Sequence, residues 1–596
     1  MFLRSQIRKK DGKEHTYWSV VENRRLHDGR VAQRQVLYLG EVNDSQREAW
    51  RKTLDAHSPD SNSTSQIALF PHDRPAPTDD ARVVRIRLDQ LALHRPRQWG
   101  GCWLALELYR QLGLDTFFAE HLPASRKGTR WDRILRVLVT QRLLAPGSEW
   151  HLHRDWFERT ALADLLGEDF GLAEIHKLYA TLDQVLPLKD KLFDHLRERW
   201  RDLFGANYEV LLYDLTSTYF ETDTPEDPED PRKHGYSRDH RPDCPQVVIA
   251  LVVTPEGFPL AYEVLPGNTA DNTTLKGFLE KIEARYGQAK RVWLMDRGIP
   301  TEAVLEAMRA SDPPVSYLVG TPKGRLSALE NDLLERRWET VRAGVQVKLL
   351  PQDGEVYVLA KSEGRVDKER AIRHKKLRRL LMRLHALRKQ LPARDKLLMA
   401  LGAAKQEAGR FYALLKITVP GADQAVSAET FSFQFERARL RVVRRREGSY
   451  LLRSNLAGKP PGELWSYYMQ LVQVEEAFKN LKGDLALRPV YHQKLERIEA
   501  HILVAFISYT LHVCLRQRLR AVAGGLTPRA VLEKFCAVQM VDVHLPTTDG
   551  RTVILTRHTQ PEKELELLLE QLKLTLPAQP PPKITADKVT IAALAM

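Results

Sequence analysis

The chain has 596 residues, with 91 Lys or Arg against 77 Asp or Glu, which makes its formal net charge +14. A chain of this length buries several hydrophobic cores, so about three or four domains are expected. The basic balance, with a pI near 9.4, favours a polyanionic partner. The cysteines lie far apart without a CxxC pair, which excludes an evident zinc module or disulfide framework: Cys102, Cys244, Cys514 and Cys536.

No segment of the sequence has the pattern of a signal peptide or a membrane span. The N-terminus, MFLRSQIRKKDG, is charged and lacks an apolar core. The longest apolar run, Ile502–Leu515, contains His512 and is shorter than the roughly 20 residues that a span needs. We interpret this run as a core helix and expect a cytoplasmic protein with no membrane association.

The first 205 residues change from strand-like to helical patterning. Residues 1–80 contain alternating segments that predict a β-hairpin around 27–29, followed by a polar, Pro-containing linker. Residues 85–205 have helical periodicity, clearest in WDRILRVLVTQRLL and HKLYATLDQVL. Cations at the start of this region suit DNA phosphates, although a solvated helix start is an equal alternative: Arg126, Lys127, Arg130 and Arg133.

Two apolar runs each end in an aspartate. They are YEVLLYD, which ends at Asp214, and KRVWLMD, which ends at Asp296. Each pattern predicts a buried central strand that delivers a carboxylate at its C-terminal end, where open α/β sheets place their ligands. Taken alone, either aspartate is also typical of a turn or a helix cap.

A third acid lies in the segment YMQLVQVEEAFKNLK, from Tyr468 to Lys482. Its spacing predicts a helix on which Tyr468, Glu475 and Lys482 share one stripe. A carboxylate followed two turns later by a cation suits a helix beside a phosphodiester and a metal ion, and equally a solvated charge pair. Together with the two aspartates, Glu475 could supply the oxygen ligands that hard divalent cations require.

These motifs resemble those of DDE transposases of bacterial insertion sequences, in the subgroup with an interrupted ribonuclease-H-like catalytic domain. The subgroup signature is Tyr, two residues, Arg, three residues, Glu, six residues, Lys. Tyr468, Glu475 and Lys482 match it, whereas Leu471 stands at the Arg position and removes one expected phosphate contact. Four further blocks are similar to the family: YDLTSTYFE, the stretch from Gly235 to Asp271, MDRGI and LRPVYH.

The resemblance implies an α/β fold, in which a ribonuclease-H-like mixed sheet is interrupted by a β-rich insertion. The 178 residues between Asp296 and Glu475 leave room for that insertion. An N-terminal β-hairpin module and a helical region precede the sheet. We expect these units: 1–80 hairpin module and linker, 85–205 helical and end-binding, 206–323 first part of the catalytic core, 324–458 insertion, 459–525 second part with the signature helix, and 526–596 C-terminal helices and tail.

The insertion combines strand-like and basic segments. Strands are expected around VQVKLLPQ, EVYVLAK, FYALLKITVP, FSFQFERARLRVV and SYLLRSNL. The helical run Arg365–Lys389 has eleven Lys or Arg against two acids, and ARLRVVRRR adds a second basic patch. We interpret both as DNA contacts. The alternative is a solvated basic helix whose leucines pack inward: Leu377, Leu380, Leu381 and Leu384.

The resemblance further implies that Asp214, Asp296 and Glu475 are the catalytic residues and the metal ligands. The cofactor would be Mg²⁺, with Mn²⁺ as the alternative. The enzyme would cut the inverted-repeat ends of an element and join them to target DNA by two-metal phosphoryl transfer. Expected DNA contacts come from the matched blocks: Tyr468, Lys482, Lys479, Arg297, Arg238, Arg241 and Arg488.

Relatives in this family act as homodimers during synapsis, and the same is expected of this bacterial, nucleoid-associated chain. Two alternatives stay open at the sequence level. A metal-dependent nuclease of the same fold would share the acids, but it would need neither a large basic insertion nor an end-binding region. A DNA-binding protein derived from a transposase would have lost an acid, and all three acids are present.

Overall fold

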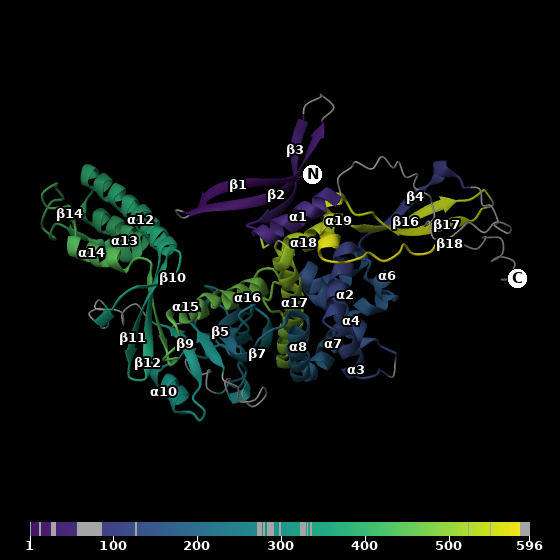
Figure 1. Cartoon of the computed structure of the whole chain (residues 1–596), viewed down its shortest axis with the longest axis horizontal. Helices are drawn as coiled ribbons and strands as arrows, with labels where there is room; N and C mark the ends of the chain where they lie inside the picture. The colour runs from purple at the N-terminus through teal and green to yellow at the C-terminus, as the bar shows by residue number, and fades with distance from the viewer. Residues whose placement is uncertain are drawn as a thin grey trace.

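The computed structural model describes residues 2–10, 13–25, 31–56, 86–125, 128–270, 277, 280–282, 291–296, 300–321, 329, 332–333, 336–522, 524–548 and 550–584. A central sheet lies between a helical bundle and a projection of helices (Figure 1). Two smaller sheets, formed mainly by segments near the two ends of the sequence, extend outward from the bundle (Figure 1). Arg126, Lys127 and Arg297, which the sequence singled out, lie outside the described residues.

The central sheet has nine strands in the order β10-β11-β12-β15-β9-β8-β5-β6-β7. Within it, β5 pairs antiparallel with β6 and parallel with β8. β6 pairs antiparallel with β7, and β8 pairs parallel with β9. The apolar runs form the interior strands because both of their faces are covered. Their bounds are β5 Val210–Tyr219, β6 Gln246–Val253, β7 Pro259–Pro266, β8 Val292–Met295 and β9 Ser316–Gly320.

Most strands of the expected insertion do not form a separate lobe. β15 pairs with the edge of β9, and β12, β11 and β10 follow, so these four strands extend the same sheet. This arrangement covers an edge whose backbone groups would otherwise stay unpaired. The bounds are β10 Glu339–Arg342, β11 Val345–Gln352, β12 Glu355–Ser362 and β15 Ser449–Ser454. Two further strands of the insertion pair with each other in a small sheet of their own.

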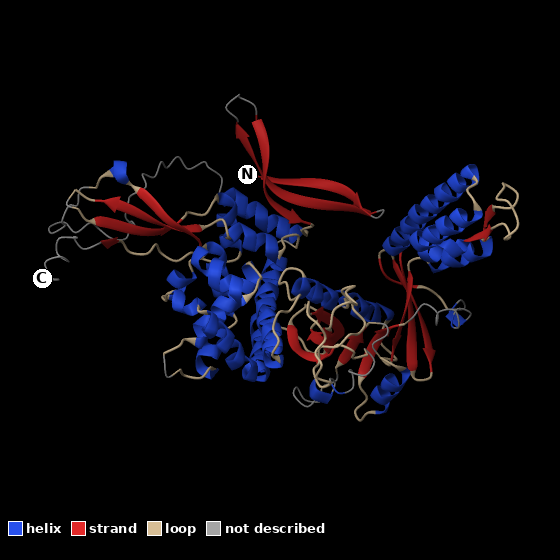
Figure 2. Ribbon diagram, turned by 180° about the vertical axis from the view of Figure 1, so that it is seen from behind, coloured by secondary structure: helices blue, strands red, loops and turns tan. Residues whose placement is uncertain are grey.

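Residues 363–447, between β12 and β15, form what we call the helical projection, which stands away from the sheet at one end of the molecule (Figures 1 and 2). It has a small core of its own around Leu384, Leu397 and Phe431. The expected strand through ARLRVV is wrong, because these residues form a helix in which Arg and Leu are favourable. The elements are α12 Glu363–Gln390, α13 Arg394–Ala408, β13 Leu415–Thr418, β14 Ser432–Phe435 and α14 Arg437–Arg446.

The helical bundle packs around α17, Leu495–Val522, which contains the apolar run of the sequence. This helix is long and apolar enough to span a membrane, but 94% of its apolar window is buried inside the protein. The other large helices of the bundle are α2 Gly100–Gln111, α3 Leu114–His121, α4 Trp131–Leu144, α7 Ile175–Val185 and α8 Lys189–Phe204. Further helices are α5 Glu149–His151, α6 Leu162–Leu166, α18 Pro528–Phe535 and α19 Lys563–Gln571, together with α10 Glu302–Ala310, which lies beside the central sheet (Figure 1).

Two peripheral sheets involve the ends of the described chain. The expected hairpin corresponds to the antiparallel pair β2–β3, to which β1 adds a third strand that the sequence did not predict. β4 pairs with β16, more than 440 residues later, in the order β18-β17-β16-β4. The bounds are β1 Phe2–Lys10, β2 Lys13–Arg25, β3 Val31–Gly40, α1 Asp44–Ala56, β4 Ala92–Gln98, β16 Gln539–Pro546, β17 Thr552–His558 and β18 Lys583–Ile584.

Candidate active site

Asp214 and Asp296 lie at the same level of neighbouring parallel strands. Tyr213 pairs with Met295, and each aspartate is the next residue along its strand. The sequence predicted that Asp214 ends its strand. This is wrong, because β5 continues to Tyr219 through its pairing with β6. Instead, Asp214 lies where the parallel pairing with β8 ends. The register therefore places Asp214 and Asp296 side by side at the C-terminal end of β8.

Glu475 approaches these acids from α16, Val472–Lys482, which packs against β5 and β6. The neighbouring Glu476 pairs with Arg516 of α17, at 3.0 Å between Oε1 and Nη1. The rotation of α16 follows from its buried apolar face, which leaves Glu475 on an exposed face of the helix. The residues of the buried face are Val474, Ala477, Phe478 and Leu481. Two consecutive glutamates therefore have different surroundings, one beside the acids and one beside Arg516.

The three carboxylates influence one another electrostatically. Burial raises the pKa of Asp214 to about 7, and the nearby Asp296 and Glu475 add to the increase. A hydrogen bond of 2.8 Å from the Leu215 N–H to Asp214 Oδ1 only partly opposes this. Burial and Asp296 also raise the pKa of Glu475. Asp214, Asp296 and Glu475 therefore share one site, in which nearby cations only partly balance the negative charge.

That charge state fits a hard divalent cation. The three acids offer only oxygen ligands, which Mg²⁺ and Mn²⁺ prefer. Arg238 lies close enough to favour the charged form of Asp214, yet the net effect of its surroundings is still a raised pKa. A bound cation would supply the positive charge that the protein itself provides only in part.

The signature segment is two helices, not one continuous helix. α15, Pro461–Gln470, carries Tyr468, while α16 carries Glu475 and Lys482. The break is at Leu471, whose N–H bonds back three residues to Tyr468 O at 3.1 Å. Leu471 is 7% exposed and belongs to the main core. The position where the family signature has Arg therefore points into the protein here.

Tyr468 contacts the insertion. Its ring stacks on Tyr450 of β15, with 4.5 Å between ring centroids. A hydrogen bond with Tyr468 raises the pKa of Arg365, at the start of α12. In this structure, Tyr468 therefore joins the signature segment to the base of the helical projection.

Lys482 and Arg488 meet at a carboxylate that the sequence analysis did not single out. Lys482 Nζ lies 2.8 Å from Asp239 Oδ1, and Arg488 Nη1 bonds to the same oxygen. Burial and the nearby Arg238 lower the pKa of Lys482 to about 8, whereas Asp214 opposes this decrease. Arg238, Lys482 and Arg488 are thus brought together beside the acids.

The other predicted DNA contacts have different surroundings. Lys479 is exposed on α16, one turn beyond Glu475. Arg241 forms ion pairs with Glu221 and Asp243, both at 3.0 Å, and lies over the ring of Tyr219. The carboxylates of Asp243 and Glu221 raise the pKa of the Arg241 guanidinium. Arg297 lies outside the described residues.

Asp239 could have been found in the sequence only by its position. It lies in SRDHRPD, between the flanking arginines Arg238 and Arg241, inside a block that matches the family. Nothing in that pattern distinguishes it from Asp243, which is exposed and paired with Arg241. What distinguishes Asp239 is burial, because its side chain is only 4% exposed.

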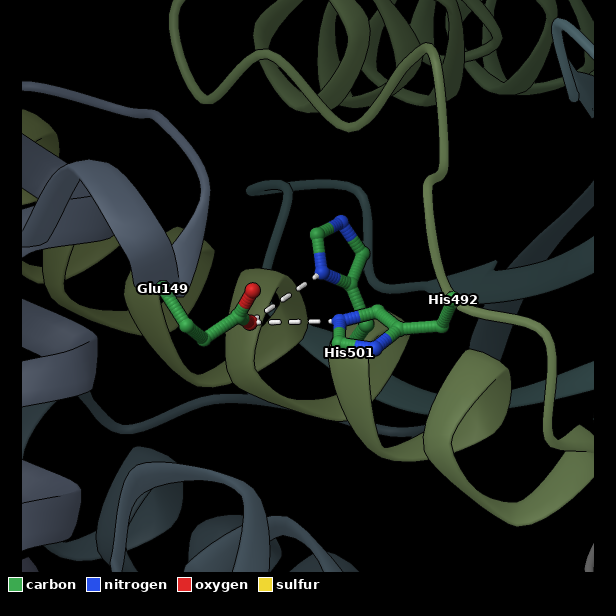
Figure 3. A group of neighbouring side chains, drawn as sticks. All are labelled: Glu149, His492 and His501. Carbon is green, nitrogen blue, oxygen red and sulfur yellow. Dashed lines mark hydrogen bonds and ion pairs between the residues drawn. The ribbon is translucent and has the colours of Figure 1, made fainter. Parts of the chain in front are cut away.

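A second buried cluster braces the segment that carries Arg488. Glu149 of α5 faces His492 and His501, whose rings lie side by side (Figure 3), with Oε1 at 3.2 Å from His492 Nε2 and 3.8 Å from His501 Nδ1. These three side chains have the donor atoms of a metal site. However, the Arg142 guanidinium lies 3.4 Å from His501 Nδ1 and already balances the charge of Glu149. We therefore assign this cluster to support of the fold.

Charge effects within this cluster agree with that assignment. Burial opposes ionisation of Glu149, but hydrogen bonds with His492 and His501 outweigh it and hold its pKa well below the usual range. Burial and Arg142 lower the pKa of His501 to about 4. The cluster is therefore an ionised carboxylate, a cation and a neutral His501, which needs no further positive charge.

Comparison with known proteins gives consistent results. Residues 206–511 match the model of the transposase DDE domain, and residues 3–66 match the N-terminal domain of IS1634 family transposases. Among solved structures, the cryo-EM structure of the piggyBac transposase synaptic complex with hairpin DNA is 9% identical, with a TM-score of 0.35, over 72% of this chain and 79% of that chain. No curated protein matches the chain significantly.

Proposed function

The chain belongs to the transposase DDE-domain family and is a DNA transposase, and we propose that Asp214, Asp296 and Glu475 are the catalytic residues that hold its divalent metal ions. The observation that carries this proposal is the convergence of two strand residues and one helix residue in a single under-neutralised cluster. The family model covers all three positions. Loss of any one carboxylate would remove ligand oxygens from that cluster.

We also propose that β7, β6, β5, β8 and β9 form a ribonuclease-H-like core. Supporting this are the antiparallel β7-β6-β5 pairing and the parallel β5-β8-β9 pairing in that spatial order. α16 then covers the sheet next to β5 and supplies the third acid. In this core, the insertion begins after β9 and returns through β15, which continues the sheet.

In the reaction, bound Mg²⁺ or Mn²⁺ would activate the attacking oxygen and stabilise the leaving oxygen during cleavage and strand transfer. The chain's own residues provide the rest. Asp214, Asp296 and Glu475 must be deprotonated to act as ligands, so Asp214 must lose the proton that its burial favours. Lys482 and Arg488 would hold a phosphate of the DNA strand beside these acids, with Lys479 and Arg238 as further cations.

The helical projection is the main source of positive charge for DNA binding. Residues 363–447 contain 22 Lys or Arg against 9 Asp or Glu, which is +13 of the chain's net +14. α14, Arg437–Arg446, has no buried residue. We propose that the projection contacts DNA phosphates, while the bundle within 85–205 contacts the element ends. Synapsis as a homodimer and a cytoplasmic, nucleoid-associated location complete the proposal.

A strand-cleavage and strand-transfer assay on DNA with the element's inverted-repeat ends tests the assignment of the acids. Glu475→Gln keeps the shape of the side chain but removes the charge, so cleavage in Mg²⁺ should fall at least about a thousandfold while end binding stays nearly unchanged. Glu476→Gln is the matched control, because it changes the next residue, which pairs with Arg516 instead. It should retain cleavage.

The proposed role of Glu475 would be refuted if Glu475→Gln cleaves at the wild-type rate. Equal loss of cleavage in both variants would show that the two substitutions act through the position of α16. Binding of the uncut ends, measured in the same preparations, separates a loss of chemistry from a loss of DNA recognition.

A further inference from the structure

Asp239 is buried between two of the cations that we place on DNA. Lys482 Nζ is 2.8 Å from Asp239 Oδ1, and Arg488 bonds to the same oxygen. The Lys482 side chain is 11% exposed and that of Arg488 32%, so both retain a path to solvent. The cations thus share one atom of a buried carboxylate that comes from the connection between β5 and β6.

The cations flank a tight turn that is held from several sides. Within the turn, the Leu487 N–H donates to Leu481 O at 3.0 Å, and the Ala486 N–H donates to Gly483 O at 3.3 Å. Arg142 of α4 donates to Ala486 O at 3.3 Å. Asp239 closes the open side of this turn, because it joins the residue before the turn to a residue after it.

The donor count shows that DNA need not displace Asp239. An ammonium has three N–H donors and a guanidinium has five, and Asp239 Oδ1 accepts one from each. Two donors of Lys482 and four of Arg488 remain to meet a phosphate. Displacement would also leave the Asp239 carboxylate buried without its counter-charges, which is strongly unfavourable.

We propose that Asp239 is a positioning residue that holds Lys482 and Arg488 together as a two-cation seat for one phosphate of the DNA strand. This inference rests on the proposed function, in which these cations face DNA beside the acids. Asp239 itself touches neither the DNA nor the reacting atoms.

Single-turnover cleavage of the same DNA ends by the full-length chain tests the proposal. Asp239→Asn should lower the cleavage rate about ten- to a hundredfold, because two cations lose their common anchor. Asp239→Glu should recover part of the rate, since a carboxylate returns. Lys482→Ala and Arg488→Ala should also be slow. Adding Asp239→Asn to the double variant Lys482→Ala/Arg488→Ala should cause no further loss, because Asp239 acts through these two cations.

Asp230→Asn is the matched control. It removes another buried Asp–Arg pair from the same connection, with Arg232, at 2.7 Å between Nη2 and Oδ2. A general loosening of this connection would slow both variants equally and overturn the proposal. A further loss of rate when Asp239→Asn is added to Lys482→Ala/Arg488→Ala would do the same, since it would indicate a role that does not act through the two cations.

Other outcomes are equally distinct. If Asp239→Asn cleaves faster or binds DNA more tightly, the carboxylate blocks the phosphate seat and the inference is wrong. If Lys482→Ala and Arg488→Ala both cleave at the wild-type rate, the proposed DNA contact of these two cations is refuted, whatever the cleavage rate of the Asp239 variants. Loss in those two variants with a normal Asp239→Asn rate overturns only the positioning role.

Discussion

Asp214 combines two demands that oppose each other at the scale of a single residue. As a ligand it must be ionised, yet burial beside Asp296 and Glu475 raises its pKa to about 7. The sign of the linkage follows. Without metal, the folded state binds a proton more tightly than the unfolded state, so this group's contribution to stability is present below pH 3.8 and is lost as pH rises through about 7.

Metal binding should therefore depend on pH. Because a divalent cation must displace the proton of Asp214, the apparent affinity for Mn²⁺ or Mg²⁺ should be about tenfold lower at pH 6 than at pH 8. Calorimetric titration of the full chain at both pH values would measure this, and at pH 6 binding should release protons to the buffer. Equal affinity at the two pH values would contradict the raised pKa.

At the scale of the element, the burial of Leu471 at the junction of α15 and α16 explains why a cation is missing at the position of the family arginine. Leu471 lies at the break and packs into the main core, so its position cannot present a cation to DNA. Tyr468 correspondingly turns to Tyr450 and Arg365.

Restoring the signature arginine should harm this protein. Leu471→Arg would bury an unpaired guanidinium in the core and should lower the free energy of unfolding by on the order of 3 kcal/mol. Leu471→Met, which conserves volume, should cost less than about 1.5 kcal/mol. Urea unfolding of both variants would measure the difference. A stable Leu471→Arg variant with faster cleavage would show that this position can reach DNA after all.

At the scale of the whole molecule, catalysis and electrostatic attraction are assigned to different parts of one sheet. The acids lie between β5, β8 and α16, while the helical projection stands beyond β12 and β15 with most of the net charge. Those two strands are antiparallel neighbours, and Lys361 pairs with Ser449. The projection therefore enters and leaves the sheet at adjacent residues.

This geometry predicts that the projection can be removed. Replacing residues 363–447 by a two-residue Asn-Gly turn should leave β12 and β15 paired, because such a turn joins antiparallel strands. The shortened chain should retain Mn²⁺ binding. Its DNA affinity should decrease and depend less steeply on salt, since fewer phosphates are neutralised. An unchanged salt dependence would contradict a DNA role for the projection.

Several features of this protein were determined by the sequence alone, because they depend on local patterns. Apolar runs that end in Asp214 and Asp296 predicted the strands β5 and β8, and a helical spacing predicted the helix that contains Glu475. The excess of Lys and Arg from Arg365 onward predicted the basic helix α12 in the same way. Burial and periodicity produce recognisable patterns among neighbouring residues in the sequence. These predictions therefore needed no tertiary information.

Only the tertiary structure decided which of these charges meet. Asp239 lies 243 residues before Lys482 and 249 before Arg488, and no local pattern links them. Likewise, the ion pair with Arg516 gives Glu476 different surroundings from those of Glu475. Sheet pairing joins β15 to β9, so β15 does not belong to a separate lobe. Charge pairs and strand pairs depend on which residues are close together in the folded chain. The spacing of residues in the sequence does not show which residues these are.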